Sequence, residues 1–176
     1  MTAPEITFQL LDGSQASADE VEALHAAVYP EAADYAARFR VQRRQPGFAL
    51  AEARHGGYLV GYASGMPLRP STDWWRHLTA PLAEKLTAEH PGRTFALLDL
   101  VVRASWRRQG IAETLHDLIL AARTEERATL TVPPTATAAQ QAFQKWGWRK
   151  LARSRAPRDS TASDVLVVTL SAKRRG

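Results

Sequence analysis

The chain has 176 residues and no cysteine, and its formal net charge is +5 with an isoelectric point near 10.0. This length suits one ordinary domain with its own core, and the missing cysteine excludes disulfides, thiolate zinc sites and a cysteine nucleophile. No window approaches the roughly 18 apolar residues of a membrane span, and the N-terminus lacks a signal-peptide pattern, so we expect a cytoplasmic protein with no membrane partner.

The charge is distributed unevenly along the chain. Residues 1–37 contain seven acidic residues and no Lys or Arg, whereas residues 149–176 contain eight basic and two acidic residues. The ending AKRRG, residues 172–176, is typical of a flexible solvated tail. No helix-turn-helix, zinc-knuckle or aromatic RNA-binding pattern accompanies the basic charge, so no nucleic-acid partner is expected.

The first third of the chain predicts a strand, two helices and a hairpin. Residues 6–11 alternate as a strand, and residues 17–29 form an amphipathic helix whose Ser17 and Glu20 have the spacing of a capping box. A second helix is expected at 32–44. The apolar runs FALAEA (48–53) and YLVGYASGM (58–66) flank RHGG and predict a hairpin.

The middle of the chain predicts a strand–helix–strand unit. Residues 67–93 are expected to be a helical excursion between strands. Residues 94–102 are almost continuously apolar, which is typical of a strand buried on both faces. After Gly110 the apolar residues repeat on one helix face, and 128–132 alternates as a strand, so we expect a βαβ unit with parallel strands.

The last quarter predicts a helix and two strands. Pro133-Pro134 ends the preceding strand, and Thr137 with Gln140 has the spacing of a second capping box, with Thr137 as N-cap. Gly147 is placed to end this helix in the left-handed conformation. WRKLARS and VLVVTLS are the expected final strands.

The segment WRRQGIA is the most informative stretch of the sequence. A helix N-terminus has unpaired backbone N–H groups and a positive dipole end, so anions bind well there. Arg107 and Arg108 add positive charge, whereas Gly110 and Ala112 remove side-chain bulk. Together they indicate a diphosphate clamp, although neither a Walker A loop nor the dinucleotide-binding fingerprint is present.

These residues resemble a known family. Arg107-Arg108-Gln109-Gly110-Ile111-Ala112 fits the Arg/Gln-x-x-Gly-x-Gly/Ala motif of the GNAT superfamily, the Gcn5-related N-acetyltransferases; LVV before the loop, AFQKWGW and the order of elements are also similar. The resemblance implies one α/β domain over 1–176. Its mixed sheet of six or seven strands would be flanked by helices and splayed between the strands ending near 102 and 132.

The resemblance also implies acetyl-CoA as cosubstrate, no metal, and direct attack of an amine on the thioester within a ternary complex. The residues it assigns to acetyl-CoA are the whole 107–112 loop, the backbone of the preceding strand, and two residues around the late helix: Arg107, Arg108, Gln109, Gly110, Ile111, Ala112, Leu100, Val101, Val102, Thr135 and Phe143. The Val102 N–H is the candidate donor to the thioester oxygen. Phe143 stands where many members have a tyrosine that protonates the thiolate, so another hydroxyl, Tyr58 or Tyr62, or solvent would have to do so.

Two carboxylates are candidates for taking the amine proton. Asp99 lies in an apolar strand, where a carboxylate is costly unless it is paired or functional; the alternative is a structural ion pair or capping role. Leu98 stands where some similar members have Glu. Glu52, in the hairpin, is the second candidate, with an exposed strand carboxylate as its alternative.

The acceptor predicted from the sequence is a small primary amine. The acidic first helix and aromatic residues such as Tyr29 and Trp74 favour a cationic acceptor, with a solvated acidic helix face as the alternative. Two alternatives remain open. The acceptor could be a protein or peptide, or the protein could be a CoA-binding module without catalysis. By analogy, a homodimer through the edge offered by the final strands is expected.

Overall fold

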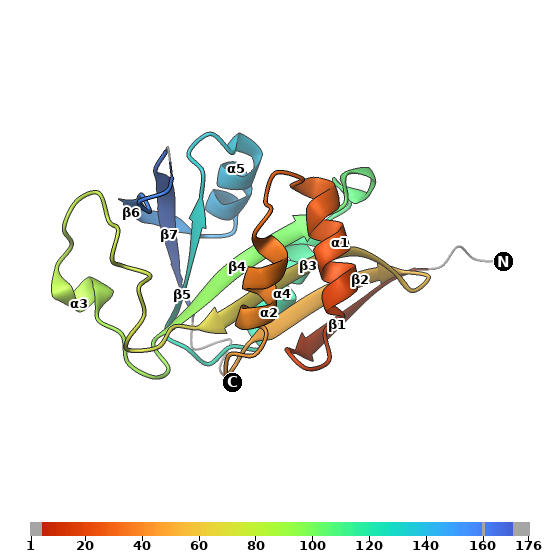
Figure 1. Ribbon diagram of the computed structural model, residues 1–176, viewed down its shortest axis with the longest axis horizontal. Coiled ribbons are helices and arrows are strands. Elements are labelled where there is room, and N and C mark those ends of the chain that lie inside the picture. The colour runs from red at the N-terminus through yellow and green to blue at the C-terminus, as the bar shows by residue number, and fades with distance from the viewer. Residues whose placement is uncertain (1–4, 160, 171–176) are drawn as a thin grey trace. The chain divides into compact units, whose positions relative to one another are not determined.

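The computed structural model describes residues 5–159 and 161–170. Its strands are β1 (Ile6–Asp12), β2 (Ala49–His55), β3 (Tyr58–Pro67), β4 (Thr94–Val102), β5 (Arg127–Val132), β6 (Arg149–Ser154) and β7 (Ser163–Thr169). Its helices are α1 (Ala18–Val28), α2 (Tyr35–Gln42), α3 (Glu84–Thr87), α4 (Ile111–Ala121) and α5 (Thr137–Lys145), with a 3-10 turn, η1, at Ala104–Trp106 (Figure 1). The predicted tail at 172–176 lies outside the described residues.

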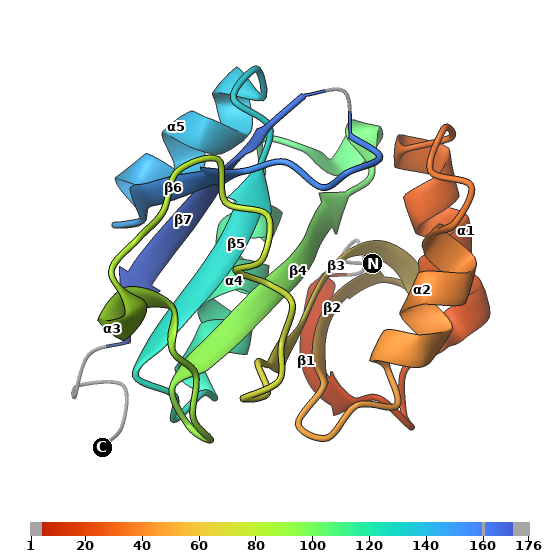
Figure 2. The same cartoon turned by 60° about the vertical axis from the view of Figure 1, so that its left-hand side comes forward.

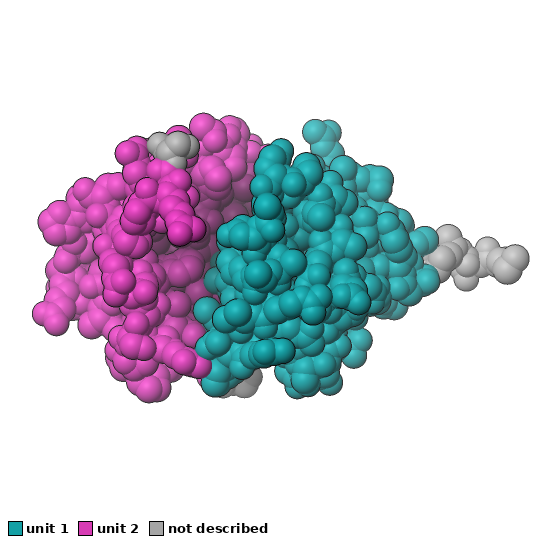
Figure 3. Space-filling model, in the orientation of Figure 1, with its two compact units in different colours: residues 1–66, 97–123 teal, residues 67–96, 124–176 magenta. Residues whose placement is uncertain are grey.

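The chain forms two compact units that are interleaved in sequence (Figure 3). Residues 1–66 and 97–123 make the first unit, and residues 67–96 and 124–176 make the second. Strand β4 runs through both, so the first unit holds β1-β2-β3-β4 and the second holds β4-β5-β7-β6. Hydrogen bonding thus orders the seven strands β1-β2-β3-β4-β5-β7-β6, which confirms the predicted mixed sheet.

In the first unit, helices cover both faces of the strands. β1, β2 and β3 are antiparallel. Figures 1 and 2 show α1 and α2 on one face and α4 on the other. Val21 and Leu24 of α1 and Phe39 of α2 are buried against Leu50 and Tyr62, because apolar spacing of three to four residues places such side chains on one helix face.

In the second unit, β4 begins as the parallel neighbour of β5. Their ladder joins residues 94–96 to residues 127–129, which confirms the predicted βαβ pairing. β7 is antiparallel to both β5 and β6, so β6 rather than β7 is the outer strand, and an isolated bridge joins Leu78 to Ser154 on it. The sheet edge that the sequence analysis assigned to the two final strands is therefore formed by β6 alone.

Two local predictions at helix starts were wrong in part. The helix expected at 32–44 begins only at Tyr35, because residues 32–35 form a turn in which Tyr35 N–H donates to the Ala32 carbonyl. Thr137 is not the N-cap of α5: Ala136 is, and the Thr137 hydroxyl donates to the Thr135 carbonyl instead.

The excursion at 67–93 is mostly irregular, and its one helix is the four-residue α3. Prolines at 67, 70, 81 and 91 remove backbone donors and disfavour helix in the residues before them. Long-range backbone bonds hold the segment instead, such as Thr79 N–H to the Arg153 carbonyl at 2.9 Å. The described residues contain no helix with the length and apolarity to cross a lipid bilayer.

Candidate active site

The loop between β4 and α4 contains two residues in the left-handed backbone conformation. Arg108 has φ 64° and Gly110 has φ 77°, so two left-handed residues precede the helix within three positions. Gly110 is the N-cap of α4, and no side chain caps the N–H groups of the first turn. Consecutive backbone turns of this kind aim N–H groups into one concavity, and the helix dipole adds positive potential.

Gly110 is required by conformation rather than by crowding. A Cβ added there would meet no atom within 4 Å, but its φ belongs to the region that disfavours side chains. Arg108 has a side chain in the same region, at a cost of about 1 kcal/mol. Residues 107–110 are exposed, whereas Ile111 is 2% exposed and anchors α4 in the core.

At the end of β4, the backbone N–H and C=O groups of successive residues face opposite sides of the strand. Arg103 N–H donates to the Val60 carbonyl of β3 at 2.9 Å, and the Val101 carbonyl lies against Gly61 of the same strand. Because strand residues alternate in direction, Val102 and Leu100 direct their N–H and C=O groups away from β3. The Val102 carbonyl accepts a hydrogen bond from Arg107 Nε at 3.3 Å, which ties the strand end to the loop.

Asp99 is surrounded by hydroxyl groups. Ser64 Oγ donates to Asp99 Oδ2 at 2.9 Å, and the Tyr35 hydroxyl donates to the same oxygen at 3.3 Å. The Tyr35 and Tyr62 hydroxyls are 2.6 Å apart. Burial raises the pKa of Asp99 above its usual value, although the Ser64 hydrogen bond and the nearby Arg38 charge oppose this.

The hydroxyl partners of Asp99 were not predicted. Tyr62 and Ser64 are two residues apart on β3 and so share a face, and β4 is the neighbouring strand. That pattern could have pointed to a polar cluster around Asp99. Tyr35 comes from α2, and no local signal in the sequence places it there.

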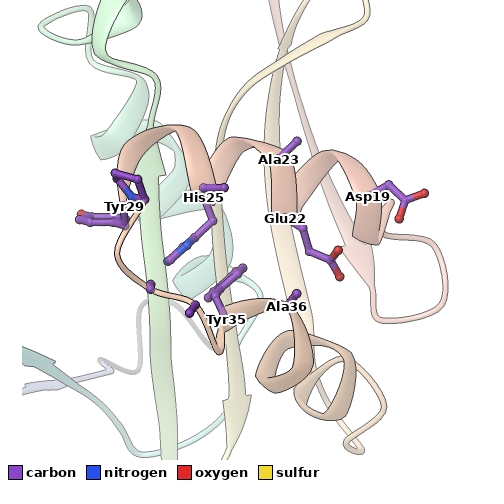
Figure 4. A pocket seen from close by; sticks show the side chains of 11 residues that line it. Asp19, Glu22, Ala23, His25, Tyr29, Tyr35 and Ala36 are labelled. Carbon is purple, nitrogen blue, oxygen red and sulfur yellow. The ribbon is translucent and has the colours of Figure 1, made fainter.

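A hollow of about 440 Å³ lies between α1 and α2 (Figure 4). His25 and Tyr35 form its wall and stack with their ring centroids 3.4 Å apart, and Tyr29, which is 48% exposed, also lines it. Asp19 and Glu22 supply negative charge, which Arg40 partly neutralises. Burial lowers the pKa of His25, so its neutral form is favoured.

Glu52 is held in a buried ion pair. Arg54 donates from Nε to Glu52 Oε1 at 2.9 Å and from Nη2 to Oε2 at 3.0 Å, while it also contacts Glu20. The Glu52 side chain is only 7% exposed. A guanidinium occupies both oxygens of this carboxylate, so the pairing favours a structural role.

Three other candidates belong to the second unit. Phe143 is 8% exposed and packs edge-on against Trp146 and Trp148, which makes it a core residue of that unit. Thr135 is exposed, and its carbonyl accepts the Thr137 N–H. The indole N–H of Trp74 is buried without a hydrogen-bond partner among the described residues. Within those residues, no group of three His, Asp or Glu is placed to hold a metal ion.

The mixed seven-stranded sheet with flanking helices matches the fold of GNAT acyl-CoA N-acyltransferases. The model of the acetyltransferase (GNAT) family matches residues 15–148. No curated protein matches the sequence significantly. The chain belongs to the GNAT acetyltransferase family, whose members are acetyl-CoA-dependent N-acetyltransferases.

Several solved structures share this fold. Aminoglycoside 6'-acetyltransferase type Ii is 15% identical with a TM-score of 0.70, and the match covers 94% of this chain and 97% of that one. NAA60 from Arabidopsis thaliana, solved with a bisubstrate analogue, is 16% identical with a TM-score of 0.67, covering 94% and 98%. An aminoglycoside 6'-N-acetyltransferase complexed with coenzyme A is 14% identical with a TM-score of 0.68, covering 94% and 97%.

Proposed function

We propose that this protein transfers an acetyl group from acetyl-CoA to a primary amine of a small molecule, by direct attack in a ternary complex in the cytoplasm. The observation that carries the proposal is the exposed loop before α4, whose left-handed Arg108 and Gly110 shape a cradle for a diphosphate. Acetyl-CoA supplies the diphosphate and an acetyl group activated as a thioester. A homodimer through the outer edge of β6 is part of the proposal.

The residues proposed to hold acetyl-CoA are those of the loop and the end of β4. The backbone N–H groups of Gln109 to Ala112 would bind the diphosphate, with Arg107 and Arg108 adding charge. Leu100 and Val102 offer backbone groups to pantetheine because these groups point away from β3, and the Val102 N–H would polarise the thioester carbonyl. Val101, the rest of the same strand end, completes this set. For Thr135 and Phe143, which belong to the second unit, the family resemblance alone supports the assignment.

The proposed acceptor site is the hollow between α1 and α2. Trp74, which belongs to the second unit, stays a candidate from the sequence alone. The volume of the hollow lies within the range of small-molecule sites, and its lining combines aromatic rings with the charges of Asp19 and Glu22. Such a lining suits a cationic amine better than a neutral one, because rings and carboxylates both attract an ammonium group. This lining favours the small-molecule acceptor over a peptide.

Asp99 is the proposed proton acceptor. An ammonium has no lone pair, so the amine must lose a proton before it attacks, and a carboxylate whose pKa is raised takes that proton more readily than an ordinary one. Ser64 and Tyr35 hold the Asp99 carboxylate in place.

Neither Tyr58 nor Tyr62, the two candidate hydroxyls, is the proposed proton donor to the leaving thiolate. Tyr62 is fully buried and bonded to Tyr35, and burial raises its pKa, while Tyr58 stacks on Arg103. Phe143 cannot donate a proton. A thiol with the usual pKa of about 8.5 is a tolerable leaving group, so solvent is the proposed proton donor.

Thermal unfolding with and without acetyl-CoA tests the cofactor cradle. At about 100 times its dissociation constant, acetyl-CoA should stabilise the wild type by roughly 2.7 kcal/mol, which raises Tm by several degrees. Arg107→Ala and Gly110→Val should lose this increase. Gly57→Val is the matched control, because Gly57 is also left-handed (φ 83°) with no atom within 4 Å of an added Cβ.

In this experiment, Gly57→Val should lower the Tm of the free protein but keep the increase with acetyl-CoA. No increase in the wild type would refute the proposed function. If the wild type does show the increase, thiol release is then measured with a panel of diamines, aminoglycosides and peptides. Release with any amine separates an enzyme from a CoA-binding module. The amines that support release separate small acceptors from peptide ones.

A further inference from the structure

Strand β1 pairs with a neighbour on one side only. It is the first strand of the sheet order, and β2 pairs with it over seven consecutive residue pairs without a register shift. The Asp12 N–H donates to the Gln15 side chain at 2.9 Å, so the backbone groups of Asp12 face away from β2. Because backbone groups alternate along a strand, those of Ile6, Phe8 and Leu10 face the same open side. Within residues 5–159 and 161–170, no backbone partner meets them there.

This edge also lacks the features that usually keep exposed strands apart. Those features are basic residues and proline in the strand, a β-bulge, or a segment that covers the edge. Residues 6–12 contain no basic residue and no proline, and Phe8 and Leu10 are each 36% exposed. By contrast, three of the six residues of β6 are basic, its pairing with β7 is shifted, and residues 77–79 bond to its end. β1 is therefore the unprotected outer strand.

The sequence of β1 matches itself across a two-fold axis. Gln9 is the midpoint of Ile6–Asp12, so two antiparallel copies paired across Gln9 overlap along the whole strand. In that register Phe8 lies opposite Leu10 of the partner subunit, and the two-fold axis repeats this contact. Opposite residues of an antiparallel pair share a face, so two Phe–Leu pairs would cover the exposed apolar side chains. The outward backbone groups of the same residues would complete the hydrogen bonds of these pairs.

The turn after β1 adds complementary charge. A hollow of about 580 Å³ beside Gly13 has Arg43 and Arg44 in its lining. The Arg43 Nε donates to the Gly13 carbonyl at 2.9 Å, but its Nη groups and the Arg44 guanidinium have no acidic partner among the described residues. In the register across Gln9, residue 13 lies opposite Glu5 of the partner subunit. Glu5 is exposed and likewise has no ion pair within the described part of the chain.

We propose that β1 is an interface between two copies of this chain, which pair antiparallel across Gln9 into one continuous sheet. A second copy is the occupant that fits, because a single register both opposes Phe8 to Leu10 and brings Glu5 to the unpaired arginines. The inference rests on the homodimer of the proposed function and places it on β1 in preference to β6. Acetyl transfer within one subunit does not depend on it.

A single introduced cysteine tests the register, because the chain has none of its own. Gln9→Cys would place two thiols opposite each other on the axis, so mild oxidation should convert most of the protein into a disulfide-linked dimer. Thr7→Cys is the matched control, since it is exposed on the same face of the same strand. The two copies of residue 7 would lie about 13 Å apart along the strands, too far for a disulfide. Equal cross-linking of both variants would overturn the register.

Sedimentation equilibrium tests the interface without a new covalent bond. Leu10→Lys should raise the dissociation constant of the dimer about tenfold or more, because the axis makes each substitution act twice. Val41→Lys changes an apolar side chain that is 63% exposed on α2, and it should leave the constant unchanged. Glu5→Arg should weaken the dimer, and adding Arg44→Glu should recover part of the loss.

Two contrary results have separate meanings. A wild-type dimer that Leu10→Lys leaves intact would overturn the assignment to β1 and leave β6 as the interface. A wild-type monomer at every concentration, with no cross-linking of Gln9→Cys, would overturn the homodimer on either edge. Neither result bears on acetyl transfer, because the rise in Tm with acetyl-CoA tests that separately. An unchanged Tm of Leu10→Lys would show that the variant is folded.

Discussion

Replacing Asp99 by asparagine is expected to lower kcat by roughly 10²- to 10⁴-fold, the range that a positioned proton acceptor contributes. Asparagine keeps the size of the side chain and an oxygen that accepts from Ser64 and Tyr35. It cannot take a proton from the amine. Steady-state rates should be measured by thiol release, with the best acceptor of the amine panel.

The pH dependence of the same variant separates catalysis from structure. Burial raises the pKa of Asp99, so the wild-type rate should fall as the pH drops through that raised pKa, and Asp99→Asn should lack this acidic limb. The contribution of Asp99 to the stability of the protein depends on pH in the opposite direction. A raised folded-state pKa favours the protonated carboxyl, so its contribution to stability is fully present below the unfolded pKa and is lost as the pH rises through the folded one.

Asp99→Asn, which resembles the protonated form, should therefore keep or raise Tm above that pH window while losing activity. Ser64→Ala is the control for positioning: it should lower kcat less than Asp99→Asn and keep the acidic limb. Unchanged kcat in Asp99→Asn, or a large fall in its Tm, would assign Asp99 a structural role instead.

Replacing Arg54 by leucine is expected to destabilise the protein by about 3 kcal/mol or more, because it leaves the Glu52 carboxylate buried without its partner. The Glu52 side chain is 7% exposed, and Arg54 binds both of its oxygens. Urea unfolding monitored by fluorescence measures the loss. The double variant Glu52→Leu with Arg54→Leu should recover part of it, since no buried charge then remains unpaired.

Arg40→Leu is the matched control for this pair. Arg40 also contacts two acidic residues, Asp19 and Glu22, but it is 54% exposed, so its loss should cost much less than that of Arg54. If Arg40→Leu and Arg54→Leu cost the same, burial would not be the cause. The folded double variant should keep acetyl transfer, which would exclude Glu52 as the proton acceptor.

The elements with local signals were predictable from the sequence. Ser17 caps α1 through a bond from the Glu20 N–H, and Gly147 follows α5 with φ 95°, both as the residue types predict. The hairpin of β2 and β3 and the start of α4 after Gly110 were predicted for the same reason. In each case the decisive hydrogen bond or backbone angle involves residues within a few positions of one another.

The sequence by itself also determined the family, because the motif Arg107 to Ala112 combines a helix N-terminus, glycine and positive charge in one short segment. Only the tertiary structure decided what surrounds the carboxylates. Asp99 meets Tyr35 and Ser64 from distant parts of the chain, and the Arg54 that pairs with Glu52 is also bound by Glu20 of α1. Such contacts depend on strand register and helix packing, and burial and pKa follow from these long-range arrangements rather than from neighbours in the sequence.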